Sequence, residues 1–248
     1  MRFGIDAPGL VISFFGAACA LGLLGLGLGI WSSGQGWAFW TSLTLGLLAL
    51  YPLFMGGLML FDSLHTKVRH ADELLDLIRW TGAEQVLDVG CGRGLMLVKA
   101  AQRLTTGHAI GVDIWQARDQ ADNSAHAALE NAQAAGVAGK VSVQTADMRD
   151  LPFADGSFDI VLSSWAVHNL DDVADRLKTI AEMVRVLRPG GTLLLSDIVN
   201  RTEYLAAAQA HQMQGARIVV RSVARDRFLR AITFGSYQPA ALLAERAG

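Results

Sequence analysis

The chain runs from Ala7 to Phe61 without a single Asp, Glu, Lys, Arg or His. An α-helix that spans a lipid bilayer needs about 20 apolar residues, so this run is long enough for two spans and a turn. We predict the spans near residues 9–30 and 38–60, with the polar, glycine-containing segment WSSGQGW (31–37) between them. The first quarter of the chain is therefore predicted to be a membrane hairpin of two transmembrane helices.

The residues that flank the two spans indicate how the hairpin is oriented. Aromatic side chains that favour the membrane interface lie near the turn, namely Trp31, Trp37 and Trp40. Basic residues lie at the opposite end, namely Arg2, Lys67, Arg69 and Arg79. Because basic flanks stay on the cytoplasmic side of a membrane, we expect both termini and the rest of the chain in the cytoplasm.

A cleaved secretory signal and a buried helical hairpin of a soluble protein are the two alternatives for the apolar run. A signal is disfavoured because the first apolar segment is too long and a second one follows it. A buried hairpin is disfavoured because helices that are apolar on every side suit lipid better than a half-wet surface. Gly25 and Gly29 have the GxxxG spacing that lets membrane helices approach closely, and this leaves a homo-oligomer through these helices open.

Charged residues return densely from Asp62 onward, and the whole chain has a formal net charge of -2. This near-neutral balance argues against nucleic acid and other polyanions as partners. The two cysteines, Cys19 and Cys91, lie in the apolar run and in a glycine-rich loop, where neither is placed to staple a secreted fold. A reducing cytoplasm fits this usage, and we predict no metal site.

After residue 62, short runs rich in β-branched residues alternate with helical patterns. The expected strands lie at 85–90, 108–114, 140–147, 158–165 and 191–198, with two later runs at 216–222 and 239–246 that could pair as an edge hairpin. The helical patterns lie at 64–80, 94–104, 119–135 and 171–187. This alternation predicts an α/β fold with a doubly wound, mainly parallel sheet. We therefore divide the chain into residues 1–62 and residues 63–248.

The segment VLDVGCGRG (86–94) joins the first predicted strand to the helix after it. Its glycines would let the backbone turn tightly and approach a ligand, with helix amides pointing at that ligand. Asp113 ends the second predicted strand, where a carboxylate can accept hydrogen bonds from both hydroxyls of a ribose. Asp147 ends the third predicted strand, and its carboxylate would reach an adenine edge. A nicotinamide cofactor fits less well, because its fingerprint spaces the glycines G-x-G-x-x-G.

Four segments in this order carry a resemblance to a known family: VLDVGCGRG (86–94), GVDIW (111–115), TADMRDLPFADGSFDIVLSSWAVHNL (145–170) and RVLRPGGTLLLSDI (185–198). From about residue 85 to residue 200 the chain resembles the class I S-adenosylmethionine-dependent methyltransferases, especially the group that includes ubiquinone and menaquinone methyltransferases. The resemblance implies a seven-stranded Rossmann-like sheet with its last strand antiparallel. It also implies S-adenosylmethionine lying across the ends of strands one to four.

The resemblance further assigns residues of this chain to the cofactor. Asp88 and Gly90 are expected at its amino-acid end, Asp113 at the ribose, and Asp147 with the Met148 backbone at the adenine. Ser163 or Ser164 would contact the methionine portion. Trp115 either stacks on adenine or packs under the second helix, and Cys91 is expected to be a small filler rather than a nucleophile. The full predicted set is Asp88, Gly90, Cys91, Gly92, Gly94, Asp113, Ile114, Trp115, Asp147, Met148, Ser163 and Ser164.

The loop after the fourth predicted strand, SSWAVHNL (163–170), would face the methyl group. A sulfonium already activates its methyl group, so the protein has to align an acceptor and exclude water, and a base is needed only for weakly acidic acceptors. His168 is the best candidate for that base, because histidine titrates near neutral pH. The alternative is that His168 orients or caps the helix that begins near residue 171. Asn169 could position an acceptor oxygen.

Other parts of the sequence bear on the acceptor. The chain lacks the Asn-Pro-Pro-Tyr and Pro-Cys segments of DNA methyltransferases, which argues against nucleobase chemistry. Residues in segments expected to cover the pocket are His126, His211, Tyr204 and Tyr237. Tethering to a bilayer raises the effective concentration of anything dissolved there, so we expect a small hydrophobic acceptor such as a quinone, lipid, isoprenoid or thiol. The alternatives are a protein methyltransferase that acts on a membrane neighbour and a non-catalytic membrane scaffold.

Overall fold

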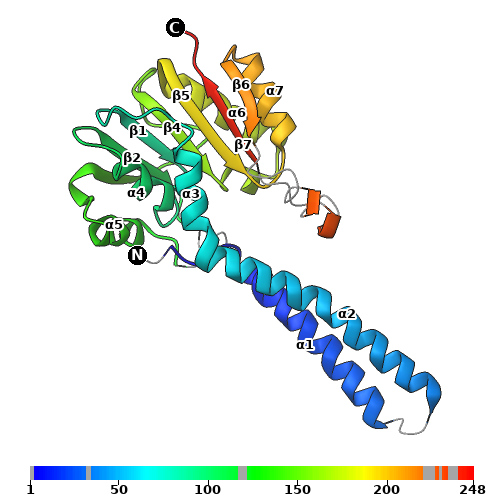
Figure 1. The fold of residues 1–248 in the computed structure, drawn as a ribbon. Coiled ribbons are helices and arrows are strands. Elements are labelled where there is room, and N and C mark those ends of the chain that lie inside the picture. The colour runs from blue at the N-terminus through cyan, green and yellow to red at the C-terminus, as the bar shows by residue number, and fades with distance from the viewer. Residues whose placement is uncertain (1–2, 32–34, 117–121, 220–226, 229–230, 234–239) are drawn as a thin grey trace. The chain divides into compact units, whose positions relative to one another are not determined.

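The structure is a computed structural model that describes residues 3–31, 35–116, 122–219, 227–228, 231–233 and 240–248 (Figure 1). It divides into two compact units. One consists mainly of residues 4–69, and the other of residues 70–116 and 123–248. The boundary predicted from the sequence, after residue 62, lies a few residues before this division.

The first unit is a helical hairpin. Helix α1 (Pro8–Trp31) and helix α2 (Gly36–Phe61) coincide closely with the two predicted spans. Both are long and apolar enough to cross a membrane, by length and composition. A π-helical turn (Asp62–Thr66) and helix α3 (Lys67–Leu75) follow α2 in the sequence.

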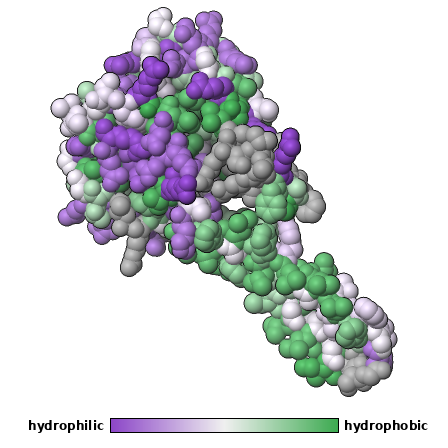
Figure 2. Space-filling view, in the orientation of Figure 1, coloured by the Kyte–Doolittle hydropathy of each residue, from purple (hydrophilic) through white to green (hydrophobic). Residues whose placement is uncertain are grey.

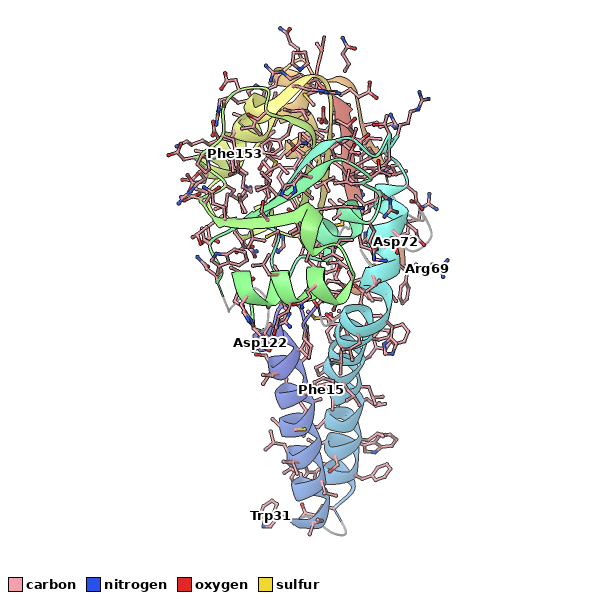
Figure 3. All side chains as sticks on the ribbon, turned by 90° about the vertical axis from the view of Figure 1, so that its left-hand side faces the viewer. Phe15, Trp31, Arg69, Asp72, Asp122 and Phe153 are labelled. Carbon is pink, nitrogen blue, oxygen red and sulfur yellow. The ribbon has the colours of Figure 1, made fainter. Side chains whose placement is uncertain are left out.

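Small residues bring the two helices of the hairpin together. A Cβ atom on Gly25 would lie 3.1 Å from the Ser42 carbonyl oxygen, and one on Gly29 would lie 3.3 Å from the Ser42 hydroxyl. Nearer the other end, Phe15 packs on Gly56, whereas Trp31 lies at the turn (Figure 3). The GxxxG spacing therefore serves close approach within one chain.

The second unit is built on a seven-stranded sheet of order β3-β2-β1-β4-β5-β7-β6 (Figure 1). Strands β1 to β5 are parallel, and β7 runs antiparallel between β5 and β6. The strands are β1 (Gln85–Val89), β2 (His108–Asp113), β3 (Val141–Thr145), β4 (Phe158–Ser164), β5 (Leu187–Asp197), β6 (Gln214–Val219) and β7 (Ala240–Glu245). This confirms the predicted fold and the pairing of the two late runs.

Helices cover both faces of this sheet, as the alternation along each strand requires. Val86 of β1 faces one core, which is completed by residues 71–78, by α4 (Leu95–Ala101) and by α5 (Ala125–Ala134). Leu87 faces the other core, with α6 (Val173–Val186) and α7 (Arg201–Ala210). The sheet is thus doubly wound.

Three details differ from the sequence-based expectation. Helix α7 was not predicted, and β5 begins at Leu187 rather than at residue 191. The predicted helix 64–80 ends at Leu75, and Leu64 at its start is exposed. Two further short helical turns, Ala138–Lys140 and Val167–Asn169, lie in loops.

Candidate cofactor and catalytic site

The strand order reverses between β1 and β4, whose carboxyl ends lie side by side. In open α/β sheets, ligands bind at this reversal point, outside the carboxyl ends of the strands. The loop after β1 is the glycine loop, residues 90–94, and the loop after β4 carries the turn Val167–Asn169. The fold therefore brings the predicted cofactor loop and the predicted catalytic loop together.

The glycine loop is fastened to the end of β2. The amides of Gly90 and Cys91 both donate to the Val112 carbonyl oxygen, at 2.8 and 3.0 Å. The amide of Gly92 donates to Oδ2 of Asp113 at 2.8 Å. These contacts hold the loop in a tight turn, with positive φ angles of 72° at Gly90 and 52° at Gly92.

Gly90 lies close to Ala166 in the loop after β4. A Cβ atom at Gly90 would lie 2.3 Å from the Cβ of Ala166 and 3.5 Å from the Met148 methyl carbon. No side chain larger than hydrogen fits there. The requirement for glycine is thus both conformational and steric.

Asp88, near the end of β1, is 1% exposed, and its Oδ2 accepts no hydrogen bond from any described residue. Burial raises the pKa of this carboxyl to about 7, and the nearby Asp113 charge adds to the rise. The Leu97 amide donates a hydrogen bond to this carboxyl, but a buried carboxylate oxygen without a partner is costly, so Oδ2 suits a cationic ligand group. The amino group of S-adenosylmethionine, assigned to Asp88 from the sequence, is such a group.

Asp113 and its neighbours form the end of β2. Besides Gly92, the Asp113 carboxylate accepts from the Trp115 amide at 2.6 Å and from the Asn123 side chain at 3.3 Å. The Trp115 indole donates to Thr145 Oγ1 at 2.8 Å, which places the ring beside the end of β3. Ile114 is exposed. The role of Asp113 at the ribose, the place of Ile114 in the cofactor set and the two alternatives for Trp115 stay predictions.

Asp147, just after β3, is held by an arginine to which the sequence alone assigned no role. The Arg149 guanidinium contacts Asp147 Oδ2 at 2.6 Å and Asp175 Oδ2, on α6, at 2.6 Å. Its hydrogen bonds to Asp147 lower the pKa of that carboxyl, which therefore stays ionised at neutral pH. An adenine amine at Asp147 would share the carboxylate with this guanidinium.

Three smaller side chains of the predicted set have defined places. Ser163 is fully buried, and its hydroxyl donates to the Val89 carbonyl oxygen at 2.8 Å, so it ties β4 to β1. Ser164 is half-buried at the end of β4. Cys91 is buried against Gly111, and burial raises the pKa of its thiol well above the usual value. A thiol kept protonated in this way supports the filler role.

His168 lies in the turn after β4 and contacts a buried carboxylate. Its Nδ1 is 2.6 Å from Oδ1 of Asp197, the last residue of β5, and its backbone amide donates to Oδ2 at 3.0 Å. The N-cap of α6 is Asp172, whose carboxylate accepts from the Ala174 amide at 2.8 Å. The capping role considered for His168 is therefore filled by Asp172. Asn169 is half-buried in the same turn.

The residues expected to cover the pocket differ in their exposure to solvent. Tyr204 is buried, and its hydroxyl donates to Asp197 Oδ2 at 3.0 Å. His126 and His211 are exposed, and Tyr237 lies outside the described residues. Asp197 was not among the residues predicted from the sequence. Asp197 ends β5, in the run TLLLSD, as Asp113 ends β2, and this position at the end of a strand was the signal that could have found it.

Comparisons with known proteins find similarity over part of this unit. A family described as "Methyltransferase domain" matches residues 87–195. The chain is 33% identical over 134 residues to the 27-O-demethylrifamycin SV methyltransferase of Amycolatopsis mediterranei, covering 53% of this chain and 44% of that protein. It is 36% identical over 112 residues to the demethylmenaquinone methyltransferase of Symbiobacterium thermophilum, covering 45% of this chain and 41% of that protein. The chain thus spans less than half the length of these two relatives.

A solved structure agrees in fold. The structure of a geranyl diphosphate methyltransferase in complex with SAM superposes with a TM-score of 0.59, at 22% identity, over 76% of this chain and 89% of that one.

Proposed function

We propose that the protein is a membrane-anchored, S-adenosylmethionine-dependent methyltransferase whose acceptor is a small molecule that partitions into membranes, a proposal supported by the match of residues 87–195 to a methyltransferase domain. The observation that best supports this activity is that three parts of the site lie together. The first part is the buried Asp88 carboxylate, and the second is the glycine loop. The third is the His168 loop, whose Ala166 contacts Gly90 of the glycine loop.

The cofactor, when bound, supplies an activated methyl group. The residues around it have the remaining tasks. Asp88 would neutralise the amino end, the glycine loop would admit the cofactor close to the backbone, and Asp113 would fix the ribose. The loop after β4 would then hold an acceptor in line with the methyl group, where alignment and exclusion of water provide most of the acceleration.

The anchor is supported by the first unit. Helices α1 and α2 contain 24 and 26 residues, and at a rise of about 1.5 Å per residue each is long enough for a hydrocarbon layer of about 30 Å. Only 17% of the most apolar window of either helix is buried, unlike a core helix of a soluble protein. Figure 2 shows the surface of the hairpin as largely hydrophobic. Arg2 and the basic residues after α2 favour a cytoplasmic methyltransferase unit.

The acceptor class follows from the tether and from the relatives. A bilayer anchor favours substrates that reside in the membrane, because it raises their effective concentration at the site. The two relatives are named for a menaquinone precursor and for a rifamycin, both small molecules rather than macromolecules. These observations support a quinone-like, lipid-like or other hydrophobic small acceptor.

Calorimetric titration of the full-length protein in detergent with S-adenosylhomocysteine tests the cofactor site. We expect the wild type to bind and Asp113→Ala to lose most of the affinity, since Asp113 also holds the Gly92 amide. Asp155→Ala is the matched control, because it removes an exposed, ion-paired aspartate. Absence of binding by the wild type would favour a scaffold role for the fold.

A further inference from the structure

The carboxylate of Asp197 is the buried centre of a cluster formed by Asp197, His168 and Tyr204 at the end of β5. Asp197 is 2% exposed and contacts four hydrogen-bonding groups. They are His168 Nδ1 at 2.6 Å, the His168 amide at 3.0 Å, the Ile198 amide at 2.8 Å and the Tyr204 hydroxyl at 3.0 Å. Two of these groups contact each carboxylate oxygen, which uses the four lone-pair positions of an ionised carboxylate.

This arrangement determines where the imidazole proton of His168 lies. The two backbone amides can only donate, so each oxygen of Asp197 already accepts one hydrogen bond. Burial and the Asp197 charge raise the pKa of the Tyr204 phenol far above its ordinary value, so that hydroxyl donates as well. With three donors on its two oxygens, Asp197 is surrounded as a hydrogen-bond acceptor, and the fourth contact fits the same pattern when His168 Nδ1 carries the hydrogen. In the neutral ring, Nε2 then holds the lone pair.

The loop that carries His168 is fixed at a second point. Arg176 of α6 is buried and donates to the carbonyl oxygens of Leu170 and Asp171, at 2.7 and 2.9 Å. The same guanidinium pairs with Glu203 of α7 at 2.8 Å, one residue before Tyr204. The His168 loop is thus held by Asp197 at one end and by Arg176 at the other, and α7 supports both contacts.

The Nε2 side of the His168 ring is the side without a protein partner among the described residues. The His168 side chain is 21% exposed, and within the described part of the chain no hydrogen bond to Nε2 is found. Its loop contacts the glycine loop through Ala166 and Gly90. The free nitrogen is therefore the one that can meet an acceptor beside the cofactor site.

We propose that Asp197 is a positioning residue that holds His168 in the Nδ1–H form, so that Nε2 accepts a proton from an acceptor hydroxyl or thiol. The inference rests on the proposed function and narrows it to acceptors with an O–H or S–H group. The acceptor loses its proton to Nε2, its oxygen or sulfur bonds to the methyl carbon, and the former carbon–sulfur bond leaves its electron pair on the cofactor sulfur. The Asp197 carboxylate balances the imidazolium charge that forms.

The test is a long-range proton–nitrogen correlation spectrum of the full-length protein in detergent, labelled with nitrogen-15 at histidine. It is recorded at a pH of about 8.5, where histidine rings in general are neutral. The difference from His168→Gln identifies the His168 signals. We expect the Nδ1–H form in the wild type, retention of that form in Tyr204→Phe, and loss of the preference in Asp197→Asn. An Nε2–H form in the wild type, or an unchanged spectrum in Asp197→Asn, would overturn the proposal.

Two further measurements, of S-adenosylhomocysteine binding and of methyl transfer, separate this proposal from the proposed function. Asp197→Asn should bind S-adenosylhomocysteine like the wild type but transfer methyl groups on the order of 10²-fold to 10⁴-fold more slowly. If wild-type membranes transfer no methyl group at all, the proposed function fails, while the tautomer result stands by itself. If Asp197→Asn does not fold, the wild-type spectrum alone decides.

Discussion

Asp88 is a carboxylate whose protonation should couple the cofactor to pH. Its pKa is raised to about 7, against about 3.9 in an unfolded chain, because burial disfavours the charged form. Between these two values the folded, unbound protein holds a proton that the unfolded chain has released. Asp88 therefore contributes progressively less to the stability of the unbound protein as pH rises from about 4 to about 7.

Binding of an ammonium group should favour the ionised form of Asp88 over the protonated form. We expect affinity for S-adenosylhomocysteine to rise by up to about tenfold per pH unit toward pH 7 and to level off above it, because only the ionised carboxylate pairs with the cation. Calorimetric titrations from pH 5 to pH 8 measure this, with Asp88→Asn as the control that should bind weakly and without the rise. Equal pH profiles for the two proteins would exclude Asp88 as the partner of the amino group.

Gly90 allows conformational strain to be separated from a steric clash. Gly90 and Gly136 both have a φ of +72°, but a Cβ at Gly90 meets Ala166, whereas one at Gly136 meets nothing within 4 Å. We expect Gly136→Ala to cost about 1–2 kcal/mol in the free energy of unfolding from the left-handed backbone alone. Gly90→Ala should cost more and should also abolish S-adenosylhomocysteine binding. Denaturant unfolding with calorimetry compares them, and equal effects would argue against the contact between the two loops.

At the level of helices and strands, the hairpin offers a geometric test. A Cβ at Gly29 would lie 3.8 Å from the Ser42 Cβ, within the range of disulfides. In a Cys19→Ala background, Gly29→Cys with Ser42→Cys should form an intrachain disulfide on mild oxidation, seen as a mass loss of two hydrogens. Gly27→Cys with Ser42→Cys should not, because Gly27 faces open space. Equal cross-linking of both pairs, or none, would contradict the packing of α1 on α2.

The periodicity of the sequence located most elements, since alternating β-branched runs and amphipathic patterns report burial directly. Helix α7 was missed because two of its three buried positions are Ala207 and Ala208, which give little hydrophobic contrast. Within the site, Asp88, the glycine loop and His168 could be found from local motifs. Asp197 could be noticed at its strand end, but its role could not be assigned, because its contact with His168 joins residues 29 positions apart. Arg149 lies two residues from Asp147, but its second contact, with Asp175, is 26 positions away and depends on the tertiary fold.

For the whole molecule, the proposed membrane topology makes a separate prediction. The protein should remain in the membrane pellet after an alkaline carbonate wash. In intact cells, a membrane-impermeant maleimide should label Gln35→Cys near the hairpin turn but not Asp155→Cys in the methyltransferase unit, both in the Cys19→Ala background. Lysed cells are the control, in which both should react. Release by carbonate, or labelling of Asp155→Cys in intact cells, would contradict a spanning hairpin with a cytoplasmic domain.

The decisive measurement follows methyl label from S-adenosylmethionine in membranes that contain the full-length protein, with Asp113→Ala membranes alongside. The label is partitioned among an organic extract, the headspace, the protein pellet and the aqueous phase. A membrane-anchored methyltransferase for small hydrophobic acceptors predicts label in the organic extract, or in the headspace for a volatile thioether, that Asp113→Ala lacks. Label confined to the protein pellet or the aqueous phase, or equal label from both proteins, would contradict it.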